Sequence, residues 1–318
     1  MRAHTDQQPI QFLDLSIIVV NWNTGELLRE CLNAVYNTVK SLSFETIVVD
    51  NGSTDGSLRM LRNDFAQVKL LANEENLGFA EANNQGISIS KGNYVLLLNS
   101  DAVLQESTVE RMVAFLDGRR EVGVVGPALI LPNGSYQLGA GGFEFSLLTA
   151  FNYYSFLSKL SPLLLRGLWL EQKDGFEKEI EVDWVSGACL MARVELFRAV
   201  GSLDTSYFMY MEDVEWCRRV REEGWKICYL PFARTIHHYR ASSSKDAPTD
   251  WLESVDSYYR LHHGQAETML FHLTAACGFL MRSLVYRMGR LLLRRRDFAD
   301  RSNLVLAYGR KSLSMAFR

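Results

Sequence analysis

The stretch YVLLLNSDA, residues 94–102, is an apolar run that ends abruptly in three small polar residues, Asn99, Ser100 and Asp101. A buried strand requires the apolar part, but packing gives no reason for a carboxylate at its carboxyl end. In an open α/β sheet, that end of the strand faces the ligand. An Asp there can bind a hard cation, and the cation can hold a diphosphate. A strand that runs into an Asx turn would look the same, so both interpretations stay open at this point.

Four similar apolar runs surround this stretch. They are short and rich in Val, Ile and Leu, as expected for strands covered on both faces. They are LSIIVVN from Leu15, ETIVVD from Glu45, VKLLAN from Val68 and VGVVGPALI from Val122. Helix-like segments separate the five runs, over residues 26–40, 54–64, 79–91 and 107–118. Because strands alternate with helices, the first 131 residues predict a parallel sheet with right-handed crossovers, in a nucleotide-binding α/β unit.

The rest of the chain has a different pattern. Residues 145–170 are apolar and aromatic and are interrupted by Pro162. They fit a core helix, a flap over the substrate or a membrane-contacting segment, and the sequence leaves all three open. After about residue 250 the pattern is helical. Residues 268–281 form an apolar run of about fourteen residues, shorter than the ~20 needed to span a bilayer, so an interfacial helix is favoured.

Composition and charge narrow the classes of partner. The net charge is −3, but from Arg282 onward ten Lys and Arg face only Asp297 and Asp300. A basic tail with interleaved leucines indicates a membrane surface rather than nucleic acid. The polar N-terminus lacks the apolar run of a signal peptide. Five cysteines without ligand spacing are expected to be small buried hydrophobes in a reducing compartment: Cys31, Cys189, Cys217, Cys228 and Cys277.

A second candidate site is MEDVEWCRR, in which Glu212 and Asp213 precede residues with helical spacing. Carboxylates in the first turn of a helix are favoured by its dipole, so a purely structural role is possible. The aromatic cluster of residues 207–211 would place these acids against an apolar wall. Such surroundings raise the pKa of a carboxyl group and suit a general base.

Other polar residues follow the remaining strand-like runs. Asp50 ends the second run and could accept hydrogen bonds from a base or ribose, although Asn51-Gly52 as a turn and Ser53 as a helix cap explain its neighbours. A helix beginning near Asn76 and Gly78 could face phosphate. His237 and His238 follow a short strand-like run. Such histidines are more often structural, unless Asp101 brings a metal nearby.

Taken together, these segments resemble the family 2 inverting glycosyltransferases of GT-A fold, and within them the bacterial rhamnosyltransferases. The resemblance covers roughly residues 15–244. It is carried by SIIVVNWN, VVDNGSTDGS, NEENLGFAEANNQG, LLLNSDA, VSGACLMAR, GSLDTSYFMYMEDVEWCRR and PFARTIHHYRASSS. Rival folds lack their motifs here: the turn after the first strand is NWNTGELL rather than G-x-G-x-x-G, and no P-loop sequence is present.

The resemblance implies a role for each candidate residue. Asp101 would be the metal ligand of a DXD motif in which Asn99 replaces the first Asp and removes one negative charge. His237 would be a second metal ligand, with His238 as the alternative. Asp213 would be the catalytic base, supported by Glu212. The donor-binding residues would be Val20, Asn23, Asp50, Asn76, Gly78, Asn99 and Ser100.

The predicted protein is thus α/β, a single GT-A domain with a mostly parallel, Rossmann-like sheet and a helical, basic C-terminal extension. We expect an N-terminal tail (1–14), a nucleotide-sugar half (15–131), an acceptor half (132–248) and a membrane-associating helical region (249–318). The resemblance implies transfer of L-rhamnose from dTDP-rhamnose to a polyprenyl-diphosphate-linked glycan, with Mg²⁺ or Mn²⁺. The expected location is the cytoplasm, at the inner face of the plasma membrane. The alternatives are a UDP- or GDP-sugar donor, or a non-catalytic relative that binds nucleotide sugars or glycans.

Overall fold

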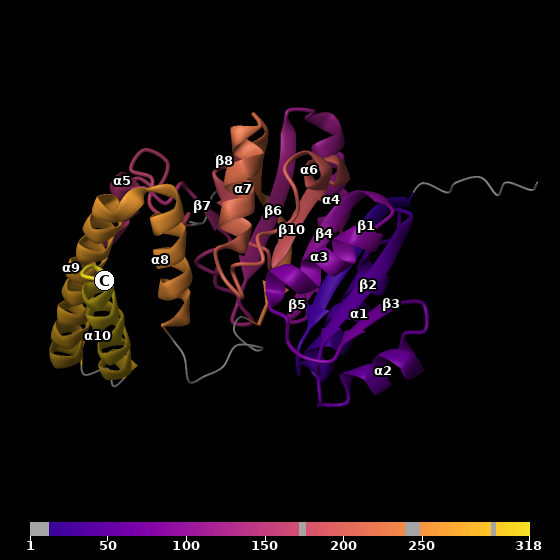
Figure 1. Cartoon of the computed structure of the whole chain (residues 1–318), viewed down its shortest axis with the longest axis horizontal. Coiled ribbons are helices and arrows are strands. Elements are labelled where there is room, and N and C mark those ends of the chain that lie inside the picture. Colours follow the sequence, from indigo (N-terminus) through magenta and orange to yellow (C-terminus); the bar gives the residue numbers. More distant parts are fainter. Residues whose placement is uncertain (1–12, 172–175, 239–248, 294–296) are drawn as a thin grey trace, which may run out of the picture.

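The computed structural model describes residues 13–171, 176–238, 249–293 and 297–318. Over these ranges the chain forms an α/β unit around a nine-stranded sheet, with a group of helices beside it (Figure 1). The predicted fold class is confirmed. Residues 239–244, which carry the end of the motif PFARTIHHYRASSS, lie outside the described ranges.

The N-terminal half of the sheet is parallel, as predicted. Its strands are β1 (Leu13–Asn21), β2 (Phe44–Asn51), β3 (Lys69–Asn73) and β4 (Gly92–Asn99), in the spatial order β3-β2-β1-β4. The connecting helices are α1 (Gly25–Thr38), α2 (Ser57–Asp64) and α3 (Phe79–Ile89). Val20 pairs with Asn99 and Asn21 pairs with Asp50. This register brings the polar ends of three strands to one edge of the sheet.

The second half of the sheet departs from the simple parallel order. The fifth predicted strand, β6 (Val122–Ile130), is separated from β4 by β10 (Cys189–Arg193), which runs antiparallel to both. The sheet continues with β11 (Lys226–His237), which pairs with β5 (Ala102–Leu104) and β8 (Ile180–Val182). Between these strands lie α4 (Thr108–Gly118), α6 (Val194–Ala199) and α7 (Glu212–Glu222). A two-stranded sheet pairs β7 (Gly141–Gly142) with β9 (Trp184–Val185).

The apolar runs of β1 and β4 form the centre of the core. Ile17, Ile18, Leu96 and Leu97 are all fully buried, because helices cover both faces of the sheet. Four of the five cysteines are buried, as expected, but Cys277 is exposed, so the expectation fails for that residue.

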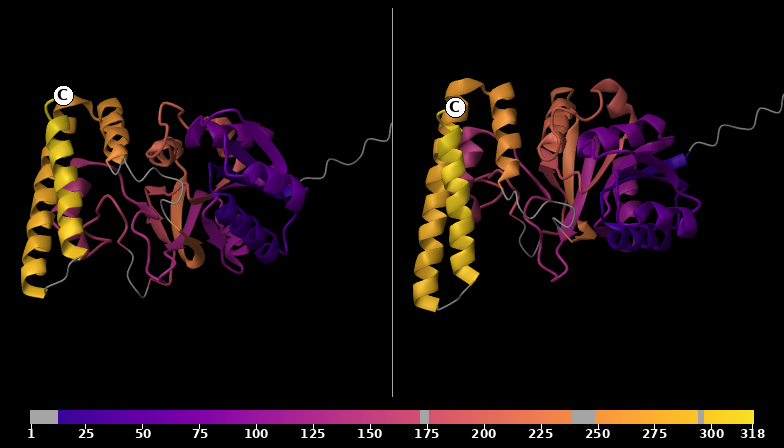
Figure 2. Two further views of the ribbon diagram at one scale, coloured as in Figure 1. Left: turned by 90° about the horizontal axis from the view of Figure 1, so that it is seen from below. Right: turned by 60° about the horizontal axis from the view of Figure 1, so that its bottom comes forward.

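The C-terminal region is helical and packs as a bundle. It comprises α8 (Asp250–His262), α9 (Gly264–Leu293) and α10 (Asp297–Met315), with α5 (Leu147–Tyr154) and the short η1 (Leu157–Lys159) against α9. Helices α9 and α10 run side by side (Figure 2). The helical pattern expected after about residue 250 is confirmed, and α9 extends beyond the apolar run of residues 268–281 at both ends. Of the helices in the described residues, α9 is long and apolar enough to cross a membrane, although 44% of its apolar window is buried in the protein.

Residues 145–170 combine a core face with an exposed face. Phe145, Tyr154 and Leu168 are buried, whereas Leu148 and Leu164 are largely exposed. Phe145 contacts both Trp184 of β9 and Tyr258 of α8, so the segment packs against the α/β unit and the C-terminal helices. Glu144 strengthens this junction, because it pairs with Arg221 of α7 and its Oε1 accepts a hydrogen bond from the Tyr258 hydroxyl of α8 (2.8 Å).

Candidate active site

The turn after β4 places Ser100 and Asp101 at the edge where the strands end. Ser100 Oγ lies 2.7 Å from Thr24 Oγ1, and the Asn99 backbone carbonyl accepts a hydrogen bond from the thiol of Cys31 (3.6 Å). Ser100 and Asp101 are both buried. The turn leads directly into β5, whose Ala102 pairs with His237 at the end of β11. The sheet register thus brings His237 beside Asp101.

The His237 ring contacts three polar groups. Its Nε2 lies 3.0 Å from Asp101 Oδ1 and 3.3 Å from Asn99 Nδ2, and its Nδ1 lies 2.7 Å from Gln137 Oε1. Because an amide oxygen can only accept a hydrogen bond, Nδ1 carries the proton. Nε2 is thus the ring nitrogen that faces the Asp101 carboxylate. His238 is directed differently, since its Nε2 lies 3.7 Å from Glu30 Oε2.

The separation of Asp101 and His237 would suit two ligands of one divalent ion. Two adjacent ligands at about 2.1 Å from an octahedral ion lie about 3.0 Å apart, and the observed Nε2–Oδ1 distance is 3.0 Å. Gln137 fixes the orientation of the His237 ring through the other ring nitrogen, as hydrogen-bond partners of metal-bound histidines do. The described residues contain no group of three or more His, Cys, Asp or Glu side chains able to hold a metal. Two protein ligands suit ions such as Mg²⁺, whose remaining positions are filled by substrate phosphates and water.

Glu212 and Asp213 open helix α7. The two residues before them, Tyr210 and Met211, have positive φ angles of 70° and 73°, a conformation that non-glycine residues adopt at a cost and that clusters at functional sites. Asp213 Oδ2 accepts a hydrogen bond from the Gly187 backbone N–H (2.8 Å), and Oδ1 accepts one from Val214 (2.8 Å). Each carboxylate oxygen retains a lone pair for a further donor.

Burial raises the pKa of both carboxyl groups in this pair. For Asp213, the hydrogen bonds from Gly187 and Val214 partly oppose the effect of burial. For Glu212, burial acts together with the charge of Asp213 and raises the pKa well above its usual range. Glu212 Oε2 is buried without a hydrogen-bond partner. The pair therefore favours a protonated Glu212 beside an ionised Asp213, which is the state that a general base requires.

One cavity of about 720 Å³ contains both sets of residues. Asn99, Ser100, Asp101 and His237 line one part of it, and Glu212 and Asp213 line another. Of the predicted donor-binding residues, Val20 and Asn76 also line this cavity. Eight predicted residues from β1, the loop before α3, β4, the turn after it, α7 and β11 thus face the same space, as binding of two substrates requires.

Asn23, Asp50 and Gly78 do not line this cavity. Asp50 is fully buried and accepts hydrogen bonds from Asn21 Nδ2 and the Ser53 backbone N–H. Ser53 does not cap α2, which begins at Ser57; its hydroxyl instead accepts a hydrogen bond from the Asn23 backbone N–H (2.9 Å). Gly78 has a φ of 88°, and a Cβ there would lie 2.7 Å from the Phe208 carbonyl oxygen. A glycine is required at this position because the loop at Gly78 packs closely against the loop at Phe208.

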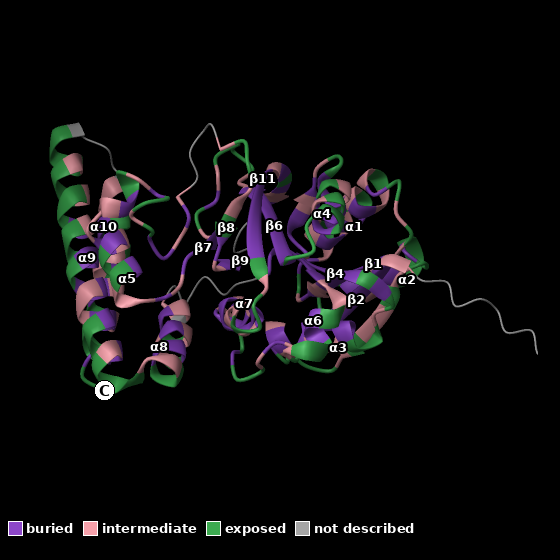
Figure 3. Cartoon of the chain, turned by 90° about the horizontal axis from the view of Figure 1, so that it is seen from above, coloured by how far each residue is buried: buried purple, intermediate pink, exposed green. Residues whose placement is uncertain are grey.

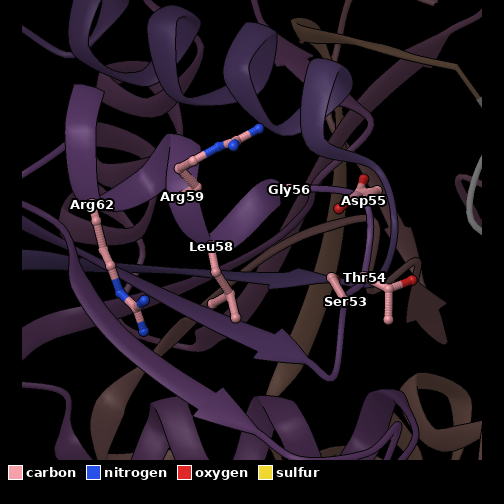
Figure 4. Close-up of a pocket in the computed structure, with 7 residues that line it drawn as sticks. All are labelled: Ser53, Thr54, Asp55, Gly56, Leu58, Arg59 and Arg62. Carbon is pink, nitrogen blue, oxygen red and sulfur yellow. The ribbon is translucent and has the colours of Figure 1, made fainter.

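Another hollow, of about 520 Å³, lies at the start of α2. It is lined by Ser53, Thr54, Asp55, Gly56, Leu58, Arg59 and Arg62. Figure 4 shows the guanidinium groups of Arg59 and Arg62 pointing in different directions. The two cations do not converge on one point, and none of these seven residues lines the larger cavity.

Some cavity residues were not predicted from the sequence. Gly187 lies within the motif VSGACLMAR, which contributed to the resemblance without a role for any of its residues. Gln137 lies in a stretch that reads as a loop, so its position behind His237 had no local signal. Seven further aromatic residues of the cavity lie outside the motifs, on α8, α9, α10 and in residues 145–170.

The comparisons with known proteins agree with this geometry. The family described as Glycosyl transferase family 2 matches residues 16–161. The N-acetylglucosaminyl-diphospho-decaprenol L-rhamnosyltransferase of Mycobacterium tuberculosis is 28% identical over 246 residues, which are 73% of this chain and 78% of that protein.

Solved structures establish the fold. The mannosyltransferase PcManGT from Pyrobaculum calidifontis, in complex with GDP-Man and Mn²⁺, matches with a TM-score of 0.60 and 16% identity, over 96% of this chain and 87% of that chain. GalNAc-T7 with UDP, GalNAc and Mn²⁺ matches with a TM-score of 0.55 and 15% identity, over 77% of this chain and 48% of that chain. The fold is that of the GT-A glycosyltransferases. Residues 16–161 thus carry the family 2 match, and together with the relatives named as glycosyltransferases they identify this chain as a glycosyltransferase.

Proposed function

We propose that this glycosyltransferase moves a sugar, with inversion, from a nucleotide-sugar donor to a hydroxyl group of a polyprenyl-diphosphate-linked glycan. The first candidate donor is dTDP-rhamnose, and the product would serve cell-surface polysaccharide synthesis. The observation that carries the proposal is the single cavity that contains both the Asp101–His237 pair and the buried Asp213. The rhamnose and the lipid-linked acceptor follow the name of the mycobacterial relative.

The proposed chemistry is a single displacement. A divalent ion held by Asp101 and His237 would neutralise the developing charge of the leaving nucleoside diphosphate. Asp213 takes the proton of the acceptor hydroxyl, whose oxygen bonds to the anomeric carbon from the face opposite the leaving group. The bond from that carbon to the donor phosphate breaks, and the configuration inverts, as in single-displacement glycosidases. Asn76, Asn99, Ser100 and Val20 are proposed to contact the donor from the strand ends.

The roles of Asn23, Asp50 and Gly78 are proposed differently. Asp50 and Asn23 organise the loop after β2 through Ser53 and Thr54, so they would shape the donor site rather than contact the donor directly. Gly78 would act by allowing the loop at Asn76 to pack against Phe208.

We place the enzyme at the cytoplasmic face of the plasma membrane as a peripheral protein. The support is the exposed face of α9, whose ribbon is largely green in Figure 3. On this helix Leu284, Met288 and Leu291 are exposed by 60%, 58% and 80%. Arg287 and Arg290 flank these residues on the same helix. The opposite face of α9 packs on α5, α8 and α10 and buries polar His272 and Ser283. A helix with one packed face and one exposed apolar face suits a position in the plane of the membrane–water interface.

A UDP- or GDP-sugar donor is the second candidate, because GalNAc-T7 was solved with UDP and PcManGT with GDP-Man. Calorimetric titration with dTDP, UDP and GDP, each with Mn²⁺ and with chelator, separates these donors. Metal-dependent binding of dTDP alone supports the first candidate. Release of nucleoside diphosphate from the matching sugar nucleotide then separates a transferase from a non-catalytic binding protein. A folded protein that binds none of the three nucleotides would rule out the proposed donor site.

A further inference from the structure

The cavity extends from the Asp213 region into the C-terminal helices, where its walls become aromatic. Six rings from α5, α8, α9, α10 and the segment before β8 line this arm: Tyr153, Trp169, Trp251, Phe279, Tyr286 and Tyr308. Their centroids follow one another at short spacing, with 4.6 Å from Tyr153 to Trp169, 6.0 Å from Trp169 to Trp251 and 5.7 Å from Trp251 to Tyr308. We call these six residues the aromatic arm. Walls of this kind suit an apolar ligand.

Arg282 supplies a positive charge to this apolar space. Its guanidinium lies 4.4 Å from the ring centroid of Phe156 and 4.6 Å from that of Tyr153, and it donates hydrogen bonds to the backbone carbonyls of Tyr153 (2.7 Å) and Tyr154 (3.2 Å). These contacts fix the side chain beside the cavity. Within the part of the chain that the structure describes, no carboxylate lies within ion-pair distance of Arg282.

The contrast with the arginines of α7 is informative. Arg218, Arg219 and Arg221 each form an ion pair with a glutamate, whereas Arg282 has only backbone and ring contacts. A guanidinium has five N–H donors and binds phosphate groups in a bidentate manner. A half-buried guanidinium that faces a cavity without a protein counter-ion therefore attracts an anionic ligand group.

The outer surface beside the arm is also apolar. Leu280, Met281, Leu284 and Val285, the residues around Arg282 on α9, are between 42% and 60% exposed. A ligand with a long hydrocarbon chain could leave the arm along this surface. An anionic group, an apolar chain and continuity with the Asp213 end of the cavity together describe a diphosphate that carries an isoprenoid chain.

We infer that the aromatic arm holds the isoprenoid and diphosphate part of the acceptor, with Arg282 binding the diphosphate. This inference rests on the proposed function, in which the acceptor hydroxyl lies at Asp213. The arm would orient the acceptor so that its glycan reaches Asp213, while the donor diphosphate lies at Asp101 and His237. The two diphosphates would thus be bound by different means, one by a metal and one by an arginine.

The test is a calorimetric titration of the full-length protein with farnesyl diphosphate in the presence of chelator. The chelator prevents binding of the probe through a metal at Asp101. Farnesol and inorganic pyrophosphate are the two comparison ligands, since each lacks one half of the probe. We expect farnesyl diphosphate to bind at least about 10-fold more tightly than either, because one set of contacts is lost in each case.

Variants then assign the binding to the arm. We expect Arg282→Gln to weaken farnesyl diphosphate binding by about 10- to 100-fold, the range for a hydrogen bond to a charged group, and Arg282→Lys to keep part of it. Val305→Trp, which fills the arm and leaves Arg282 in place, should also weaken farnesyl diphosphate binding. Arg290→Gln removes the same charge from an exposed position of α9 and should bind as the unmodified protein does. Thermal melts show whether each variant is folded.

The inference is overturned if folded Arg282→Gln binds farnesyl diphosphate with unchanged affinity. It is also overturned if farnesol or pyrophosphate binds as tightly as the full probe. Metal-dependent nucleotide binding and nucleoside diphosphate release are measured separately. A protein that passes those assays but does not bind farnesyl diphosphate would leave the proposed function standing and would exclude only the acceptor arm.

Discussion

His237 Nε2 lies 3.0 Å from Asp101 Oδ1, and Gln137 holds the opposite nitrogen of the same ring. The pairing of β5 with β11 creates this proximity, because it sets Ala102 opposite His237. The 3.0 Å separation of these two atoms equals that of adjacent ligands of one octahedral divalent ion. We therefore propose that Asp101 and His237 together hold such an ion.

Asp101→Asn and His237→Asn should each weaken metal-dependent nucleotide binding. Changing a partner that merely orients a metal ligand costs 10- to 100-fold in metal affinity, so loss of a ligand should cost at least about 10-fold. Calorimetry with the nucleotide that binds the unmodified protein, with and without Mn²⁺, measures the effect. His238→Asn is the matched control, because its imidazole is directed toward Glu30. If the His238 variant were the defective one, the assignment of His237 would be wrong.

Asp213→Asn should lower kcat by about 10²- to 10⁴-fold, the range for loss of a general base. Nucleotide affinity should be nearly unchanged, since the residue acts on the acceptor. Glu212→Gln should keep most of the activity, because its pKa is raised well above the usual range by burial and by Asp213. A neutral Gln resembles the protonated Glu that this shift favours. Equal losses in the two variants would contradict the division of roles.

The pH dependence of kcat/KM should report the same group. A base must be ionised, and burial raises the pKa of Asp213. Activity should therefore fall on acidification at a pH above the ordinary carboxyl value of about 3.9. This acid limb should persist in Glu212→Gln, because burial is the main cause of the Asp213 shift. An acid limb that moves to the ordinary carboxyl range in that variant would show that Glu212 sets the titration.

Gly187→Ala tests whether the Asp213 carboxylate must be held in place. A Cβ at this position would lie 3.1 Å from Phe79 Cε1 and 3.6 Å from Asp213 Oδ2, so the backbone hydrogen bond to Asp213 should be displaced. We expect kcat to fall by about 10-fold or more, with little change in the KM for the donor, because small misplacements of a reacting group are costly. Gly118→Ala, with no atom within 4 Å of its Cβ, should leave kcat unchanged. A Gly187 variant with normal kcat would mean that this bond does not position the base.

Much of the first half of the fold could be predicted from local pattern. The five apolar runs are strands because each is rich in Val, Ile and Leu and is separated from the next by a helical segment. The position of β10 could not be predicted, because Cys189–Arg193 pairs with β4 and β6 through contacts distant in sequence.

The candidate site also contains residues that sequence pattern could predict and residues that it could not. Asp101 and Asp213 follow a strand or begin a helix, so sequence pattern could mark them as candidates. Asp50 carried an equally suggestive pattern, yet Asn21 and Ser53 occupy its carboxylate within the fold. Gln137 had no pattern, and Arg282 was marked only as the start of the basic tail, since the place of each in the cavity depends on how a loop and a distant helix pack. Sequence pattern reveals which residues are unusual, and packing decides which of them share a cavity.

The exposed face of α9 should bind the protein to lipid vesicles. Burial of each leucine contributes about 1.5–3 kcal/mol, and the basic residues of the tail add attraction to anionic lipids. Combined Leu284→Glu and Leu291→Glu substitutions should therefore lower the vesicle-bound fraction strongly in a flotation assay with anionic vesicles. Ile89→Glu is the control, since Ile89 is a partly exposed residue at the end of α3 in the α/β unit.

High salt should weaken binding without abolishing it, because screening reduces only the electrostatic part. If the double variant floats as well as the unmodified protein, the leucines do not enter the bilayer. Complete release by salt alone would then leave a purely electrostatic attachment.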